Sequence, residues 1–340
     1  MKITRIWLSI SILILVLLGG GTCREAMAAS VADYPNRPIT LMVATSAGGG
    51  YDLGARNIAR FLPKYLPKKA DVIVDNVPGA GQLIAMHALY AAKPDGYRVL
   101  ACNALTAVMN AVTRPGQVKF DPVKFNFLGM WQEDTRAIGL SNTLKVNTWQ
   151  EIVARSKQSP VLVGTGGKGT GQHVDPLMIE AIGDLKLKFI HYDGSAQVTP
   201  ALGRGEVEME VAQVATIAEL KELKIGRIFC VLAKKRSEDA PDLPTALELG
   251  MPEKEFNKLM ENPFYGVNRV IVGPPGMDPK LVELLRNLLW KTFQDPEYLA
   301  QLKKMGGENN PMRGEQYQEL IIKKMKIAQG DKELLERLKF

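Results

Sequence analysis

The sequence predicts an α/β protein built from two doubly wound parallel sheets. Short apolar runs alternate with segments of helical periodicity, and this alternation means a parallel sheet covered by helices. The alternation stops at an irregular stretch around residues 113–124 and then restarts, which indicates a second sheet. The chain of 340 residues is long enough for two domains of ordinary size.

The first cycle contains three strands and two helices. Residues 39–44 form an apolar run, and Asp52 is a suitable N-cap for a helix with an apolar stripe at Ala55, Ile58 and Leu62. A strand at 72–74, a helix at 83–92, a turn at Pro94-Asp95-Gly96 and a strand at 97–101 follow. The second cycle predicts helices at 148–157, from about 172, and at 197–202, and strands at 161–164, 187–190 and 207–211.

Two glycine-rich stretches are the main indication of function. Residues 47–50 and 164–171 each follow a buried strand and precede a predicted helix. Such a loop exposes backbone N–H groups at the positive end of the helix, where an anion binds. We therefore expect one anionic ligand between two domains, with the N–H groups of Gly49 and Gly169 close to a carboxylate oxygen.

The first glycine stretch also allows another interpretation. Gly48, Gly50 and Gly54 spell GxGxxxG after a strand, and Asp75 lies about where a dinucleotide-binding unit carries its ribose-binding acid. A dinucleotide enzyme is therefore an alternative. An exported hydrolase is another, although no GxSxG or HExxH motif is present.

The N-terminus predicts export. Lys2 and Arg5 precede thirteen uncharged, mostly apolar residues, and Ala26-Met27-Ala28 is a small-x-small processing site. We expect a signal peptide of residues 1–28 and a periplasmic protein, with lipidation at Cys23 or an uncleaved anchor as alternatives. Very little NAD is available outside the cytoplasm, which disfavours the dinucleotide interpretation.

Charge and cysteine content exclude several classes. The net charge is +7, but the basic residues are dispersed without interleaved aromatics, so nucleic-acid binding is disfavoured. Cys102 and Cys230 lie in apolar runs typical of buried free thiols, and no CxxC pair or clustered histidines indicate a metal site. His87 and the aromatic Trp131 and Tyr192 are interpreted as structural.

Six phrases in register resemble one known family. The chain is similar to the substrate-binding receptors of tripartite tricarboxylate transporters, also called Bug proteins, over residues 34–317. The phrases that carry the resemblance are YPNRPITLMVATSAGGGYDLGAR, VDNVPGAG, KPDGYRVL, HYDGSAQVTPALGRGEVEMEV, APDLPTALELGMP and PPGMDPKLVELL.

The resemblance implies a periplasmic-binding-protein-like fold of type II with a ligand cleft between two domains. It implies a monomeric receptor without catalysis or cofactor, which delivers a small carboxylate to integral membrane transporter subunits. The implied division is a first domain of residues 29–130 and 227–340 and a second of 131–226. The implied ligand-binding residues are Ala47, Gly48, Gly49, Gly50, Asp52, Asn103, Thr106, Thr165, Gly166, Gly169, Thr170, His173, Asp193 and Ser195.

The sequence departs from the family pattern beside the second loop. Ala212 stands where the family usually has an aspartate, and Glu210 stands where an apolar residue is usual. Glu206, Glu208 and Glu210 alternate and are expected on one strand face, with Glu210 nearer the ligand-binding strand end. Lys168 is an unusual residue inside the second loop and is interpreted as facing solvent.

Overall fold

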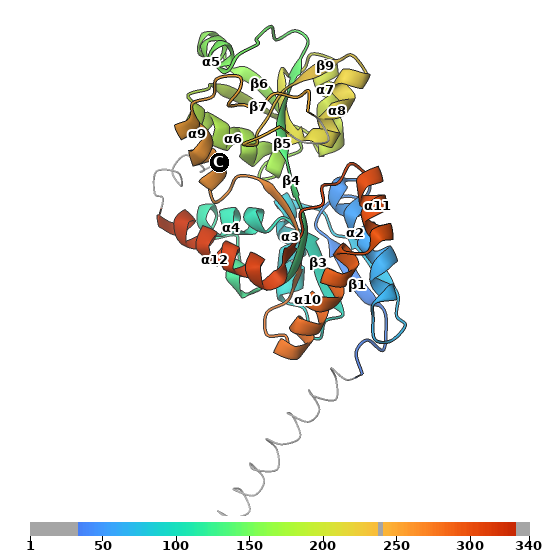
Figure 1. Ribbon diagram of the computed structural model, residues 1–340. Coiled ribbons are helices and arrows are strands. Elements are labelled where there is room, and N and C mark those ends of the chain that lie inside the picture. Colours follow the sequence, from blue (N-terminus) through green and yellow to red (C-terminus); the bar gives the residue numbers. More distant parts are fainter. Residues whose placement is uncertain (1–32, 237–240, 331–340) are drawn as a thin grey trace, which may run out of the picture.

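The computed structural model describes residues 33–236 and 241–330, which form two separate sheets. In Figure 1 the sheets and their helices make a lower and an upper body, and β4 and β5 run from one to the other. The expected alternation of strand and helix is present in both. The expected signal peptide and Cys23 lie outside the described residues.

The first sheet has six strands in the order β11-β4-β10-β3-β1-β2. β1, β2 and β3 are parallel, as predicted, whereas β10 runs antiparallel to β3 and β4. The expectation of a wholly parallel sheet is wrong here, because β10 brings the chain back from the second sheet. The strands are β1 Ile39–Val43, β2 Val72–Asn76, β3 Arg98–Cys102, β4 Asn126–Asp134, β10 Val267–Gly273 and β11 Met312–Arg313.

The second sheet has five strands in the order β7-β6-β8-β5-β9. β6 is parallel to β7 and β8, whereas β5 is antiparallel to β8 and β9. Only Thr135 separates β4 from β5, so the chain passes directly from the first sheet into the second. The strands are β5 Arg136–Ser141, β6 Val161–Thr165, β7 Leu187–His191, β8 Met209–Gln213 and β9 Gly226–Val231.

Helices cover both faces of each sheet (Figure 1). Those of the first sheet are α2 Gly50–Phe61, α3 Leu83–Tyr90, α4 Ala104–Thr113, α10 Pro279–Phe293, α11 Pro296–Lys304 and α12 Gly314–Gly330. Those of the second are α5 Trp149–Gln158, α6 Gly171–Gly183, α7 Val198–Gly203, α8 Val214–Glu222 and α9 Glu253–Glu261. Short 3-10 turns span Leu62–Lys64, Ala80–Gln82, Pro122–Lys124 and Ser195–Gln197. No helix of residues 33–236 and 241–330 is long and apolar enough to cross a bilayer.

The chain passes between the two bodies at other positions than the expected boundaries after residues 130 and 226. Trp131 lies in β4 of the first sheet, and β9 belongs to the second sheet although it begins at Gly226. The chain crosses at Thr135 and returns between α9 and β10. The apolar run of β9 has the pattern of a buried strand, but that pattern does not say which sheet the strand joins.

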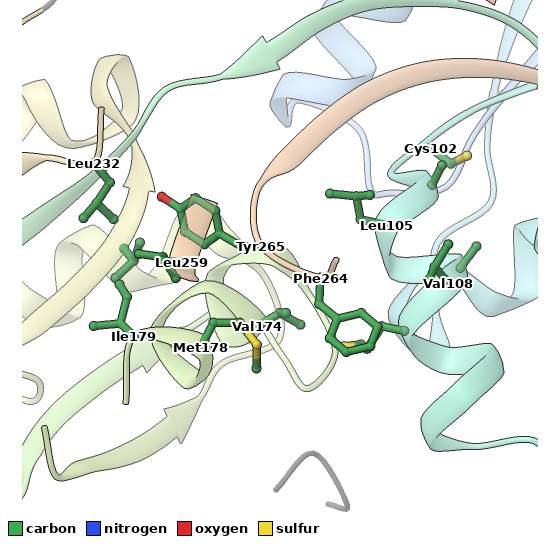
Figure 2. Packing of buried hydrophobic residues seen from close by; sticks show 14 of the residues in the cluster. Cys102, Leu105, Val108, Val174, Met178, Ile179, Leu232, Leu259, Phe264 and Tyr265 are labelled. Atoms are coloured by element: carbon green, nitrogen blue, oxygen red, sulfur yellow. The ribbon is translucent and has the colours of Figure 1, made fainter. Parts of the chain in front are cut away.

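One buried cluster extends across both bodies. Figure 2 shows Phe264 and Tyr265 on the segment that leads into β10, with α6 side chains on one side and α4 side chains on the other. Cys102 and Cys230 are both buried and free, as their apolar surroundings indicated. The segment before β10 is therefore held by apolar contacts to each body, close to the candidate site.

Candidate functional site

The first glycine loop connects β1 to α2 at the carboxyl end of the strand. Ala47, Gly48 and Gly50 are exposed, and Gly49 is the N-cap of α2 in an extended conformation. No side chain caps the helix, so its first-turn N–H groups keep their partial positive charge. The loop therefore has the form expected of an anion cradle.

Asp52 organises this loop but does not cap the helix, which corrects the expectation from sequence. It lies in the first turn, buried, and its Oδ2 accepts the N–H of Gly48 at 2.9 Å and Arg56 Nε at 2.9 Å. Its Oδ1 accepts Asn76 Nδ2 at 3.0 Å. Burial opposes ionisation, but these hydrogen bonds outweigh it and hold the pKa of Asp52 below its ordinary value.

The second glycine loop uses its own side chains to hold its backbone. The Gly166 N–H donates to Gln172 Oε1 at 3.1 Å, and Thr170 Oγ1 donates to the Gly167 carbonyl at 2.8 Å. Thr170 is the N-cap of α6, again without a side-chain cap bond to the helix. Gly166 packs so closely on Ser195 that a Cβ would lie 2.7 Å from the Ser195 backbone nitrogen.

His173 and His191 support the second loop from behind. His173 is buried, and its Nδ1 accepts the Gly169 N–H at 3.1 Å. In this arrangement Gly169 donates to a side chain, so the expected contact between its N–H and a carboxylate is not available. His191 Nδ1 lies 2.7 Å from Thr165 Oγ1. Burial, with the neighbouring His191, lowers the pKa of His173 to about 4, which keeps the imidazole neutral.

The two loops meet the same strand face at the start of β10. A Cβ on Gly50 would overlap the guanidinium of Arg269, and a Cβ on Gly171 would overlap Val267, two residues earlier. Alternate residues of a strand share one face. The second loop also approaches the first body directly, with the Lys168 carbonyl 3.3 Å from a Cβ position on Gly81. The structure thus brings the two predicted loops together.

The remaining predicted residues lie around this junction. Asn103 caps α4 through the Leu105 N–H, and its Nδ2 donates weakly to the Gly266 carbonyl at 3.5 Å. Thr106 is buried in the first turn of α4. Asp193 and Ser195 are exposed on the turn after β7.

Two buried ion pairs at the crossings were not found from the sequence. Arg269 forms a bidentate pair with Asp134 at 2.8 and 2.7 Å, and Arg136 Nε lies 2.5 Å from Asp175 Oδ2. Arg269 also donates to Gln213 Oε1 on β8 at 3.0 Å, which joins the two sheets. The only sequence signal was a charged residue inside an apolar strand, as in Val267-Asn268-Arg269-Val270.

The three alternating glutamates have different surroundings. Glu206 is exposed and paired with Arg204, and Glu208 is paired with Arg155. Glu210 is fully buried against Thr199 of α7, away from the glycine loops, and burial raises its pKa to about 7. The sequence left a cleft role for Glu210 open, and in the structure its strand face is covered by α7 and α8.

The other residues singled out from the sequence have ordinary roles. His87 Nε2 accepts the Lys119 N–H, Trp131 is buried against Gly54, and Tyr192 donates to Glu206. Lys168 is exposed. In the described part of the chain, no three His, Cys, Asp or Glu side chains are grouped as a metal site.

Comparisons with known proteins match this architecture. The model of the tripartite tricarboxylate transporter family receptor matches residues 55–337. A protein of Cupriavidus necator, described as UPF0065 protein in gbd 5'region, is 29% identical over 91% of this chain and 90% of its own length. The periplasmic binding protein BugD has a TM-score of 0.73 and 25% identity, covering 90% of this chain and 98% of its own.

A third comparison concerns the fold alone. MatC of Rhodopseudomonas palustris, solved with bound malate, has a TM-score of 0.74 at 19% identity, covering 87% of this chain and 99% of its own. The family model covers most of the chain and includes the second glycine loop, whereas the first loop, residues 47–50, precedes the matched region. The chain belongs to the tripartite tricarboxylate transporter receptor family.

Proposed function

We propose that this protein is a periplasmic receptor that binds a small carboxylate between its two bodies and delivers it to the integral subunits of a membrane transporter. The observation that carries the proposal is the convergence of two glycine loops, each at an uncapped helix N-terminus, on the start of β10. Membership of the receptor family supports the role in transport.

Backbone donors are sufficient for useful affinity. A hydrogen bond to a charged group contributes about 1.5–3 kcal/mol and a helix N-terminus about 0.3–1 kcal/mol. Four or five such contacts exceed an association cost of at least about 4 kcal/mol and leave about −8 kcal/mol, a micromolar affinity. The engaged N–H groups of Gly48, Gly166 and Gly169 hold the loops in shape. The Thr170 N–H makes only a long hydrogen bond of 3.4 Å to the Gly167 carbonyl. The donors proposed for the ligand are therefore the N–H groups of Gly49, Gly50 and Gly171, with that of Thr170 if this long bond is exchanged for one to the ligand.

The ligand is proposed to be a small di- or monocarboxylic acid. The malate bound in MatC is a dicarboxylate, and that protein shares the fold. The second end of the ligand would lie among the neutral amide and hydroxyl groups of Asn103, Thr106 and Ser195 and near the Asp193 carboxylate. The neutral groups suit a ligand whose distal end varies in chemistry.

A binding role without catalysis agrees best with the glycine loops. Gly54, the third glycine of GxGxxxG, packs on the Trp131 side chain. It therefore serves packing between α2 and the core. Asn76, next to Asp75, donates to the Thr45 carbonyl and to Asp52, so the end of β2 supports the loop. These contacts give the motif a structural explanation.

We further propose that the chain is exported, processed after Ala28 and active as a monomer of two domains. The domains would be residues 33–134 with about 263–330, and 136–262. Export is tested by sequencing the N-terminus of the secreted protein. A start at Ala29 is expected, and a start at Met1 or a lipidated Cys23 would contradict the proposal.

The binding function is tested by mass spectrometry of small molecules that co-purify with the secreted protein, followed by calorimetry with malate, glutamate, 2-oxoglutarate and benzoate. At least one acid should bind with micromolar affinity and be recovered unchanged. Conversion of the bound acid would contradict a receptor role, and failure of all four to bind would contradict a carboxylate receptor of this class.

A further inference from the structure

Arg269 is a buried cation beside the first turn of α2. Its side chain is 9% exposed, and its guanidinium lies so close to Gly50, the first residue of α2, that a Cβ there would overlap Nη1. Tyr51 lies on another side of the group, with the guanidinium carbon 5.1 Å from the ring centroid. Donors of an arginine this deeply buried require acceptors.

Only part of the donor set is used by the described residues. Nε and Nη2 donate to Asp134, and Nη2 also donates to Gln213 Oε1. Within residues 33–236 and 241–330, Nη1 makes no hydrogen bond, and it is the nitrogen nearest Gly50. One donor of the Arg269 guanidinium thus lies beside an uncapped helix N-terminus and keeps some exposure to solvent.

Two carboxylates near this position are paired with arginines. Asp134 pairs with Arg269, and Asp52 pairs with Arg56, so neither is left to neutralise the partial positive charge at the start of α2. Glu308, which accepts hydrogen bonds from Thr135, is a further carboxylate that interacts electrostatically with Arg269. A free donor from a guanidinium beside free backbone donors is a favourable geometry for a carboxylate.

We propose that Arg269 Nη1 and the first-turn N–H groups of α2 bind one carboxylate of the ligand, so that Arg269 determines specificity for an anion. The inference rests on the proposed function. It differs from a site built only of backbone donors, because a fixed positive side chain then selects against neutral ligands. Since Nη2 donates to Gln213 on β8, a ligand bound to Arg269 would be linked to the second sheet through this side chain.

The ion pair allows a test in which the two partners give opposite results. Arg269→Gln removes the donor and leaves Asp134 as an uncompensated negative charge, so affinity for malate, glutamate, 2-oxoglutarate or benzoate should fall at least about tenfold. Asp134→Asn leaves the guanidinium free to attract an anion, so affinity for the same acid should be unchanged or higher. If the pair is only structural, both variants should weaken binding. Calorimetry measures affinity, and urea unfolding separately measures stability.

The other buried arginine supplies a matched control. Arg136→Gln removes a pair with Asp175 at the same crossing, and the hydrogen bonds of Arg136 go to Asp175 and the Val211 carbonyl, not to Asp134. It should lower stability by an amount similar to Arg269→Gln, with an affinity change below about threefold. Arg269→Lys, which keeps the charge, should retain more affinity than Arg269→Gln if the first variant folds poorly.

The outcomes separate the inference from the proposed function. Suppose that one of the four acids binds the wild-type chain. If Arg269→Gln binds this acid as tightly as the wild type does, or at least as tightly as Arg136→Gln does, the inference is wrong while the receptor function remains. Binding of none of the four acids to the wild type would overturn both. Equal affinity of the wild type for the acid and for its neutral amide would also overturn the inference.

Discussion

The two glycine loops have similar sequences but are held in different ways. The loop before α2 is exposed and is organised by the charged Asp52, which binds the Gly48 N–H. The loop before α6 is organised by neutral side chains, Gln172 and His173, which bind the N–H groups of Gly166 and Gly169. A glycine motif therefore predicts where a cradle lies, but side chains behind it decide which N–H groups remain for a ligand.

Packing gives the second difference between the loops. Gly166 is in close contact with the Ser195 backbone, whereas Gly49 has only the Ser46 carbonyl nearby, at 3.7 Å from a Cβ position. The second loop needs glycine for a close backbone approach, and the first tolerates a methyl group at Gly49. The predictions below test these two differences, from the largest expected effect to the smallest.

Gly166→Ala should have the largest effect. The new Cβ would lie 2.7 Å from the Ser195 nitrogen and 2.9 Å from its Cα, and backbone atoms cannot rotate away. We expect a loss of about 3 kcal/mol in the free energy of unfolding, at the upper end of ordinary overpacking costs. Gly49→Ala is the control and should change stability by less than about 0.5 kcal/mol. Urea unfolding of the two variants measures the difference, and equal losses would contradict the contrast in packing.

Asp52→Ala should lower the free energy of unfolding more than Gln172→Ala, the corresponding change in the second loop. Asp52 accepts three hydrogen bonds, two of them from Gly48 and Arg56, and its loss leaves a buried cavity with unpaired donors. We expect about 2 kcal/mol for Asp52→Ala and about 1 kcal/mol for Gln172→Ala, which removes one neutral acceptor. Thermal unfolding at pH 7 compares the two variants. A larger loss of stability in Gln172→Ala would show that Asp52 does not stabilise its loop more strongly than Gln172 does.

His173 makes the second loop sensitive to acid. Its pKa is lowered to about 4, below the ordinary 6.5, so the unfolded chain takes up a proton between these values and the folded chain does not. Stability should therefore fall as pH decreases from 6.5 to 4, by about 3 kcal/mol at most from this residue. His173→Asn keeps an acceptor for the Gly169 N–H but does not titrate. The stability of this variant should therefore depend less on pH between 6.5 and 4, whatever its stability at pH 7.5. Urea unfolding across that pH range measures the dependence.

Much of the fold could be predicted because its signals are local. The apolar runs at 72–74 and 161–164 became β2 and β6 within two residues, since a buried strand and its glycine loop are encoded in adjacent residues. The antiparallel strands and the crossing after β9 could not be predicted, because β-pairing depends on residues far apart in the chain. Gly226–Val231 has the same apolar pattern whichever sheet it joins.

For the candidate site, too, the local features could be predicted from the sequence and the contacts between distant residues could not. The two loops lie together in the structure with His173 behind the second, and their role as the ligand site stays a prediction. The acceptor role of His173 Nδ1 depends on a ring orientation that no spacing encodes. Arg269 was missed because a single arginine in the apolar strand of residues 267–273 gives no motif; its partners Asp134 and Gln213 lie 135 and 56 residues away. Buried ion pairs between distant residues are visible only once the fold is known.

Lys168→Ala should have the smallest effect of the series. The ammonium group is exposed, and only the Lys168 backbone, through its carbonyl near Gly81, takes part in the approach of the second loop to the first body. Removing the side chain should change stability by less than about 0.5 kcal/mol and carboxylate affinity by less than about tenfold, roughly 1.4 kcal/mol. Burial and, to a smaller extent, the Lys168 charge lower the pKa of His191, so that pKa should rise in the variant. Proton NMR titration of His191 measures that shift, and calorimetry measures the affinity. Loss of binding with an unchanged His191 titration would mean that Lys168 contacts the ligand directly and that the second loop, like the first, relies on a charged side chain.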